Sequence, residues 1–396
     1  MKKLYYILVS MLVATVLAVG CTEDTTKDEM VNGPEQGVVK TEFMEVTAAL
    51  EVDEAAEGED SRAVLYDNGN GGKIEWDEND AIAAVSADGT ITKCTATSVN
   101  GSTAVFSVPT DTKYALYPHI SDDTNKKQKY ADGVLTHTLY ATHSLDGSNK
   151  VFNKNQNSMV AELSNNNLKF YNICGFVEIK LKGSEKVTHI ALRNNSREWR
   201  PITGTGTIDM TDPTNPVFTG VTAYAEAYHW VKATSDVQLS PDKATSFYLI
   251  VNPGTYENLS ICVTTDKGSY QIISKNSITI NRAKIRPFAT IDIDKLAPAT
   301  TTDLSAEGVA NCYIVPQGSD AKYYSFPIRK INDTENIADV SYAHLTWSES
   351  KTLISDVQYN AATGMVTFKY EGNNAEGNAC ISLVNSSNNI QWTYHI

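Results

Sequence analysis

From Ala63 onward, the sequence is divided into short segments that alternate apolar and polar residues and are separated by turn-forming residues. Residues 73–76 (Lys-Ile-Glu-Trp), 104–108 (Ala-Val-Phe-Ser-Val) and 114–118 (Tyr-Ala-Leu-Tyr-Pro) are examples, and this alternation predicts half-buried strands. The Asn-Gly pairs within residues 67–72 favour the positive φ angles of a hairpin turn. No long amphipathic helix is visible. The pattern therefore predicts an all-β fold, with Trp76 on the buried face of its strand.

A second series of strand-like segments begins at residue 168 and continues to residue 293. Its spacing suits a β-sandwich of about seven strands closed by Greek-key links. Residues 297–302, Ala-Pro-Ala-Thr-Thr-Thr, contain Pro298 and three Thr residues, which predicts a stiff and extended linker. Further strand-like segments follow in residues 303–396, so a third and smaller β module is expected at the C-terminal end.

The N-terminus has the pattern of an export signal. Lys2 and Lys3 precede an apolar run over residues 4–19, which is too short for a stable membrane span and ends in Leu-Ala-Val-Gly before Cys21. This ending resembles a bacterial lipobox, so residues 1–20 are interpreted as a lipoprotein signal peptide and Cys21 as the lipid attachment site, carrying a fatty acid such as palmitate. The acidic residues after Cys21 resemble the signal that sends such lipoproteins of Bacteroidetes to the outer cell surface. The alternative is an ordinary secretory peptide with an incidental cysteine.

An acidic tether, residues 21–37, is predicted between the lipid site and the first strand. Residues 38–52 read as that strand, because Phe43 and several β-branched residues occur there without Gly or Pro. The acidic run that follows, up to Asp60, should stay solvated, and Arg62 closes it. A strand joined to its domain by such a segment is one that a protease could separate.

Three of these features together resemble the N-terminal domain of Bacteroidales fimbrillins, the subunits of type V pili: the Ser-Arg-Ala sequence at residues 61–63, the Ile-Glu-Trp sequence at 74–76 and the segment 114–118. The Gly-Asp that usually follows the Trp is replaced here by Asn79-Asp80. In the family, an arginine-specific protease removes the strand before the position that Arg62 matches. The resemblance therefore implies cleavage between Arg62 and Ala63.

The resemblance also implies a domain organisation. Two tandem Greek-key sandwiches of the transthyretin-like kind are expected at residues 38–165 and 166–296, with residues 38–62 as the removable strand and tether of the first. Residues 303–396 resemble the C-terminal modules of many fimbrillin-like surface proteins. This organisation places an all-β protein at the cell surface or in a fimbrium, anchored in the outer membrane through its lipid.

The function implied is that of a structural subunit, stalk, tip or anchor, of a pilus that supports adhesion. Its partners would be other pilus subunits, which exchange strands after cleavage by the arginine-specific protease, and residues 390–396 are the candidate donor strand. In the alternative, the strand never leaves, Arg62 is a surface residue in a hinge, and the protein is a monomeric surface lipoprotein that binds a glycan or a host protein.

The formal net charge of −14 argues against nucleic acid as a partner, because no basic stripe is present to neutralise phosphates. The acidity is concentrated near the N-terminus, where residues 22–60 contain thirteen acidic residues and two lysines. Tyr (20) outnumbers Phe (10), and the abundance of Asn, Thr and Gly suits a β architecture rich in turns.

Motifs for catalysis, metal binding or cofactor binding are absent from the sequence. The seven histidines lack metal-ligand spacing, no CxxC or GxSxG occurs, and Thr203-Gly204-Thr205-Gly206 lacks the lysine of a phosphate loop. The acidic turn at residues 77–80 lacks the Gly and terminal Glu of an EF-hand. No enzyme activity, metal or cofactor is therefore predicted. Two further candidates stay open: a disulfide between Cys312 and Cys380, with the other thiols buried and free, and an aromatic sugar platform formed by Trp199, Tyr224, Tyr228 and Trp230.

Overall fold

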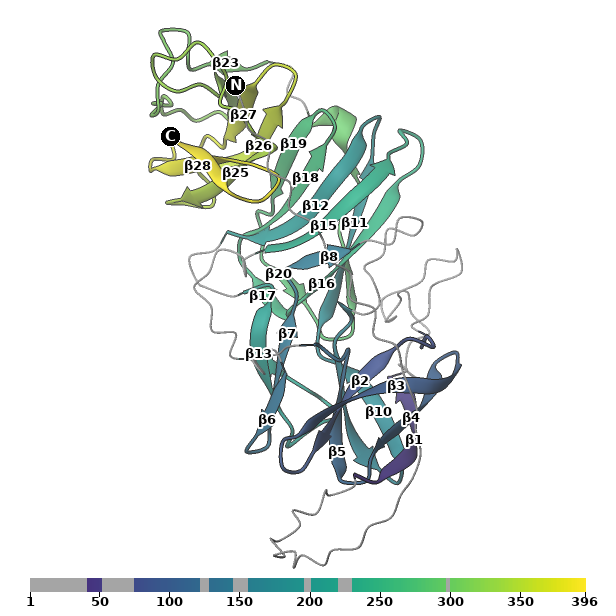
Figure 1. Cartoon of the computed structure of the whole chain (residues 1–396). Coiled ribbons are helices and arrows are strands. Elements are labelled where there is room, and N and C mark those ends of the chain that lie inside the picture. The colour runs from purple at the N-terminus through teal and green to yellow at the C-terminus, as the bar shows by residue number, and fades with distance from the viewer. Residues whose placement is uncertain are drawn as a thin grey trace, which may run out of the picture. The chain divides into compact units, whose positions relative to one another are not determined.

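The structure, a computed structural model, describes residues 41–51, 75–121, 128–144, 156–195, 201–219, 230–296 and 300–396. Within these ranges the chain consists of strands joined by turns, with short 3-10 turns such as η3 (Ile293–Lys295) and no α-helix, which confirms the predicted all-β fold (Figure 1). None of the described residues belongs to a helix with the length and hydropathy needed to cross a membrane. The predictions for Cys21, Arg62 and Ala63, the signal peptide and the acidic tether lie outside the described residues.

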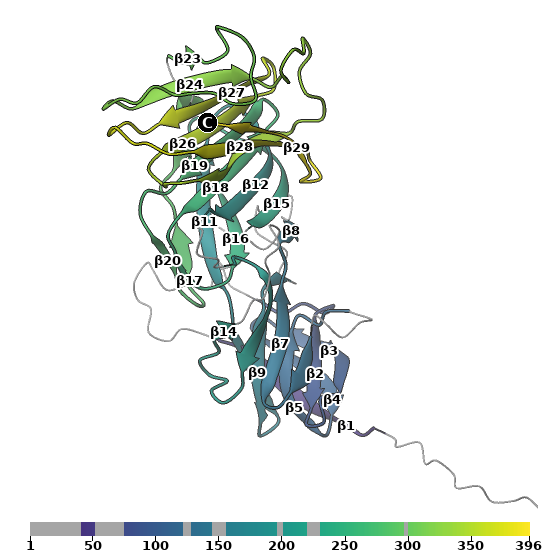
Figure 2. The ribbon, with the colours of Figure 1, turned by 90° about the vertical axis from the view of Figure 1, so that its left-hand side faces the viewer.

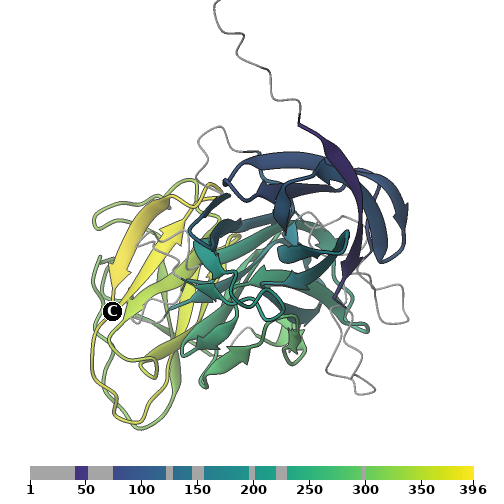
Figure 3. The same cartoon turned by 90° about the horizontal axis from the view of Figure 1, so that it is seen from below.

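Among the described residues, seven strands close a barrel in the order β1-β10-β9-β5-β2-β3-β4. Their bounds are β1 Phe43–Leu50, β2 Ala81–Ser86, β3 Ile91–Asn100, β4 Thr103–Pro109, β5 Thr112–Tyr117, β9 Met159–Ser164 and β10 Asn167–Asn172. Strand β1 is antiparallel to β4 and parallel to β10, and it lies along the wall of the barrel (purple in Figure 3). The first predicted strand is therefore an integral member of the barrel, paired along both edges.

Trp76 belongs to the barrel core with 5% of its surface exposed, which confirms that it is buried, although residues 75–77 do not form the predicted strand. It packs edge-on against three other aromatic rings at centroid distances of 5.2 to 5.4 Å: Phe106, Tyr117 and Phe170. Edge-to-face packing suits the opposite partial charges of ring faces and ring edges. This aromatic cluster fills the interior that β1 helps to enclose.

A second sheet, in the order β14-β13-β7-β6, covers another side of the barrel strands. Its members are β6 Lys129–Ala131, β7 Val134–Leu139, β13 Gly204–Asp209 and β14 Phe218–Thr219. Leu135 and Ile208 of this sheet pack against Leu116 and Val160 of the barrel. Strands β13 and β14 belong in sequence to the range 166–296 predicted for the second sandwich, yet β13 pairs with β7 of the first. Strands from the range 166–296 therefore complete a sheet of the first module, across the predicted boundary.

The second sandwich packs the sheet β16-β11-β21, to which β22 is also paired, against strands β15, β12, β18 and β19. Strand β8 extends the second of these layers at β15, and β17 and β20 form a separate pair. The bounds are β8 Thr142–Ser144, β11 Gly175–Lys182, β12 Lys186–Asn194, β15 Trp230–Gln238, β16 Thr245–Val251, β17 Gly254–Tyr256, β18 Leu259–Thr265, β19 Gly268–Ile273, β20 Ile278–Ile280, β21 Ile285–Pro287 and β22 Ile291–Asp292. Alternating apolar residues of both layers, such as Ile179, Leu192 and Phe247, form the core.

Nine of the described strands form one continuous sheet, in the order β23-β24-β27-β26-β19-β18-β12-β15-β8 (Figure 2). The added members are β23 Thr302–Asp303, β24 Lys322–Pro327, β26 Ile354–Asn360 and β27 Met365–Tyr370. Because β19 pairs with β26, the sheet runs from the second sandwich into the third module. Tyr270 packs against the core of the second sandwich, whereas Val357, the partner of its neighbour Gln271, lies in the core of the third module. One sheet therefore supports two cores on opposite faces.

The third module is completed by three described strands in the order β25-β28-β29, namely β25 Tyr342–Ser348, β28 Ala379–Val384 and β29 Ile390–His395. Side chains of β19 accept hydrogen bonds from backbone N–H groups at the edge of β25 that pairs with no described strand. The backbone N–H of Ala343 donates to Ser269 Oγ at 3.2 Å, and that of Leu345 donates to Gln271 Oε1 at 2.7 Å. The second and third modules are thus connected through a shared sheet and these side-chain hydrogen bonds in addition to the chain itself.

Candidate functional site

Strand β1 fits the barrel through three inward side chains at alternate positions, Val46, Ala48 and Leu50, whose exposed fractions are 1%, 0% and 5%. Ala48 is paired in register with Ala104 of β4 and Leu168 of β10. Each edge of β1 also satisfies the backbone of a neighbour. Removal of β1 would therefore open the apolar interior of the barrel and leave two adjacent strands with unpaired edges, a surface that soluble proteins avoid.

The end of β1 is held by an ion pair that crosses from the first module to the second. Arg282 Nη1 donates to Glu51 Oε2 at 2.9 Å and its Nη2 donates to Glu51 Oε1 at 3.1 Å. Both side chains are mostly buried, with 23% of Arg282 and 20% of Glu51 exposed. This two-point geometry is the strong form of an arginine–carboxylate contact.

Backbone groups of β10 complete this clamp. The N–H of Asn172 donates to Glu51 Oε2 at 3.1 Å, and Arg282 Nη1 also donates to the carbonyl oxygen of Asn172 at 2.9 Å. The N–H of Glu51 donates to the carbonyl oxygen of Phe170 at 2.8 Å. The Glu51 carboxylate is therefore fixed between β10 and the turn that carries Arg282. The sequence treats Glu51 as the first member of a solvated acidic run, and it gives no signal for its partner.

The candidate donor segment, residues 390–396, is part of the third module in this structure. Strand β29 pairs with β28, and Tyr394 is fully buried and donates from its hydroxyl to the carbonyl oxygen of Arg329 at 2.8 Å. At its end, His395 exchanges backbone hydrogen bonds with the segment of Asn311 and Tyr313. The candidate donor segment is therefore paired and packed in its own module, and its departure would uncover the core of that module.

Cys312 and Cys380 are both free thiols here, so the candidate disulfide is not formed. The physical reason is the position of His395 of β29, which pairs in register with Cys380 on one side and with Cys312 on the other. Two strand spacings separate the cysteines by about 9.5 Å, whereas a disulfide requires Cα atoms within about 7 Å. Of the other thiols, Cys94 and Cys174 are buried, as predicted, whereas Cys262 is only half-buried. Burial raises the pKa of Cys174 to about 12.

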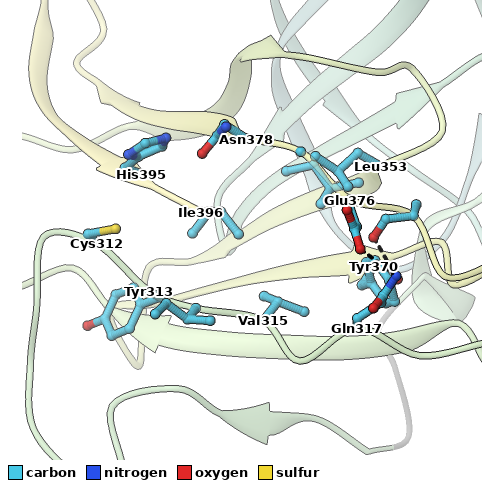
Figure 4. A pocket seen from close by; sticks show the side chains of 14 residues that line it. Cys312, Tyr313, Val315, Gln317, Leu353, Tyr370, Glu376, Asn378, His395 and Ile396 are labelled. Carbon is cyan, nitrogen blue, oxygen red and sulfur yellow. Dashed lines mark hydrogen bonds between the residues drawn. The ribbon is translucent and has the colours of Figure 1, made fainter.

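A hollow of about 290 Å³ opens in the third module between residues 312–317 and 375–378 (Figure 4). Its walls include the buried side chains of Leu353 and Tyr370. At its rim, Gln317 Nε2 donates to Glu376 Oε1 at 2.9 Å, so these polar groups are paired with one another. The alternative function of ligand binding would use a hollow of this kind.

Trp230, one of the four aromatic residues considered as a sugar platform, is 4% exposed and lies at the junction of the second and third modules. The Arg193 guanidinium lies 5.0 Å and the Lys232 ammonium 4.3 Å from the centroid of its ring. The ring also packs edge-on against His344, with 5.2 Å between the ring centroids. Arg193 also donates to the carbonyl oxygen of Leu345 at 2.7 Å. The ring is therefore used for packing between modules, and Trp199, Tyr224 and Tyr228 lie outside the described residues.

The acidic turn at residues 77–80 has a structural role. Asp80 is 2% exposed, and its carboxylate accepts hydrogen bonds from the backbone N–H of Asp77 at 2.7 Å and from the hydroxyl of Tyr117 at 2.9 Å. Burial and the charge of Asp80 raise the pKa of Tyr117. In the described ranges, no group of three or more His, Cys, Asp or Glu side chains is arranged to hold a metal ion.

His137 is fully buried between the barrel and the sheet of β7. Its Nδ1 lies 3.1 Å from Gln128 Nε2 and its Nε2 lies 2.8 Å from Ser158 Oγ. Burial lowers the pKa of His137 to about 3, and His143 is lowered in the same way. His137 therefore connects β7 to Gln128 and Ser158.

Comparison with known proteins finds no matching family model and no matching curated protein. Solved structures that overlap in part include a candidate cell adhesion protein of Bacteroides ovatus, 11% identical, with 64% of this chain and 93% of that chain covered at a TM-score of 0.39. A candidate cell adhesion protein of Bacteroides fragilis is 10% identical, with 62% and 89% covered at 0.29. A fimbrial protein of Bacteroides ovatus is 10% identical, with 62% and 50% covered at 0.22. The likeness of this chain to all three structures is distant, with TM-scores below 0.4.

Proposed function

We propose that the protein is a subunit of a cell-surface fibre and joins its neighbours by strand exchange at the position of β1. The observation that carries this proposal is the place of β1 in the barrel, where it is paired along both edges and encloses an apolar core. A vacated β1 position would be a ready acceptor for an extended segment of a neighbour, because main-chain hydrogen bonds and side-chain pockets would both be available.

The trigger is cleavage after Arg62. This residue follows Glu51 by eleven positions and precedes β2, so cutting there would break the covalent link between β1 and the rest of the barrel without interrupting any strand of the described residues. After the cut, β1 would be held by non-covalent contacts alone and could be replaced. The lipid at Cys21 lies on the same fragment as β1. A subunit that is cleaved would leave its anchor, and one that escapes cleavage would tether the fibre to the outer membrane.

The test is digestion of the purified chain with an arginine-specific protease. The expected product begins at Ala63 and, when mixed with uncleaved chains whose β1 serves as the donor strand, forms multimers that appear as ladders on unheated gels. The Arg62→Ala variant should stay monomeric, and Arg286→Ala, which removes an exposed arginine on β21, should behave as the parent chain does. Equal multimer formation by Arg62→Ala would contradict strand exchange through this end of the chain.

Export and anchoring are tested separately in cells. Cys21→Ser should abolish labelling of the protein by a fatty-acid probe, and protease added to intact cells should reach the unsubstituted protein. Labelled lipid on the Cys21→Ser variant would contradict acylation at this position, and complete protection from added protease would contradict a surface location.

A further inference from the structure

We propose that Arg282 reads a carboxylate on the strand that occupies the β1 position, and so determines which strands the site accepts. This inference rests on the proposed function, because it concerns the choice of strand at the same site. It assigns a partner chemistry: an extended segment with apolar, small and apolar side chains at alternate positions, followed at once by Asp or Glu.

The carboxylate requirement follows from where Glu51 lies. The last inward residue, Leu50, donates from its backbone to the carbonyl oxygen of Ser102, and Glu51 donates to that of Phe170, so the register of Glu51 is fixed on both edges. In that register the carboxylate meets Arg282 at 2.9 and 3.1 Å. A strand that paired correctly with β4 and β10 would therefore place its own residue at this position against the same guanidinium.

An occupant without a carboxylate would leave the site with unsatisfied groups. Arg282 would keep its hydrogen bond to the carbonyl oxygen of Asn172, but its guanidinium group would have no carboxylate to bind. The backbone N–H of Asn172 would also lose its acceptor. Leaving these groups without hydrogen-bond partners weakens binding of the strand, because both side chains of the pair are at least three-quarters buried. Charge-assisted hydrogen bonds of this kind distinguish occupants by roughly tenfold in affinity.

The middle inward position sets a second requirement. Ala48 is completely buried and faces Ala104 and Leu168 across the two strand pairs. Close-packed interiors tolerate added volume poorly, so a large side chain in place of Ala48 would push β4 and β10 apart. The site therefore selects for size in the middle of the strand and for charge at its end.

The segment 390–395 of this chain meets neither requirement. If Ile390, Trp392 and Tyr394 faced inward, the indole would take the place of Ala48 and the imidazole of His395 the place of the Glu51 carboxylate. In the opposite phase, Gln391 and Thr393 would face the apolar core. The donor for this site is therefore a different segment, with a sequence like that of β1 itself.

The experiment measures the binding of fluorescent peptides to the chain after cleavage at Arg62. The reference peptide spans residues 41–51 and is amidated, because a free terminal carboxylate would supply the missing charge. Three others carry Glu51→Gln, Ala48→Trp, or the sequence of residues 390–396. Each is tested against the cleaved parent chain, the cleaved Arg282→Gln variant, and Arg286→Gln as the matched control.

The expected result is that Glu51→Gln lowers affinity about tenfold on the parent chain and on Arg286→Gln, and has no effect on Arg282→Gln. The Ala48→Trp peptide and the peptide of residues 390–396 should not bind. If the reference and Glu51→Gln peptides bind the parent chain equally, the inference is overturned while strand exchange stands. Preferred binding of residues 390–396 also overturns it. If no peptide exchanges with β1, the proposed function and the inference fall together.

Discussion

Gly268 of β19 faces Tyr359 of β26 so closely that a β-carbon at position 268 would lie 1.8 Å from the carbonyl oxygen of Tyr359. Gly268 also has a φ angle of +157°, which side-chain-bearing residues rarely adopt. The two residues lie where the sheet of the second sandwich continues into the third module. Any side chain at position 268 must therefore separate the two strands that join these modules.

The first prediction concerns this junction. Gly268→Ala should lower the free energy of unfolding by about 2 to 4 kcal/mol, because the clash involves backbone that cannot move aside cheaply. Urea denaturation followed by circular dichroism measures the change. Gly318→Ala is the matched control, because a β-carbon at Gly318 meets no atom within 4 Å. Equal stability of the two variants would contradict the role given to the β19–β26 pairing.

The second prediction tests the packing of β1 in the uncleaved chain. Ala48→Leu should lower the free energy of unfolding by about 1 to 3 kcal/mol, because Ala48 is fully enclosed. Its neighbour Ala49 points to the other side of the strand and is partly exposed, so Ala49→Leu should change stability by less than about 0.5 kcal/mol. Thermal unfolding measures the stability of both variants. If Ala49→Leu were the less stable of the two, Ala49 and not Ala48 would face the barrel core.

The third prediction is a loss of stability in mild acid, caused by the buried His137. Its pKa is about 3 in the folded chain and about 6.5 when unfolded, so the unfolded chain takes up a proton that the folded chain cannot. Stability is therefore full above pH 6.5 and falls as the pH drops from 6.5 toward 3, by about 1.4 kcal/mol per pH unit for this group. His143 is shifted in the same direction and adds to the fall.

His137→Asn separates this effect from other acid-sensitive groups. Asparagine can keep a polar contact near Gln128 but does not titrate, so the variant should lose less stability than the parent chain between pH 6.5 and pH 5, by about 2 kcal/mol. Urea denaturation at a series of pH values gives the slope. The same slope in both proteins would mean that His137 is protonated, or solvated, in the folded state.

Local patterns predicted the strands and several details of the barrel. The aromatic and β-branched residues around Phe43 predict a strand, and the structure shows that Val46, Ala48 and Leu50 are its inward residues. Trp76 is buried as expected, but residues 75–77 do not form the strand from which this was predicted. The alternation of residues close in sequence is therefore enough for many strands, but not for the segment that carries Trp76.

The clamp on β1 could not be predicted in this way. Glu51 and Arg282 are 231 residues apart, and each taken alone has the sequence context of a solvated residue. The pairing of β13 with β7, and of β19 with β26, likewise depends on how modules pack and leaves no local signal in either strand. The shared sheet joins the third module to the second by strand pairing, a connection that the predicted linker 297–302 does not indicate.

The last prediction concerns the cysteines, measured in a Cys21→Ser chain with a thiol reagent at pH 8. Cys312 is exposed and free, so it should react rapidly. Cys94 and Cys174 are buried, and burial raises their pKa values to about 11 and 12, so little thiolate is present and they should react only after unfolding. Cys312→Ser should remove the rapid phase and leave the slow ones. A chain in which Cys312 reacts only after reduction, with a mass lower by two hydrogens, would instead contain the Cys312–Cys380 disulfide, and β29 would then have to leave its place between the two cysteines.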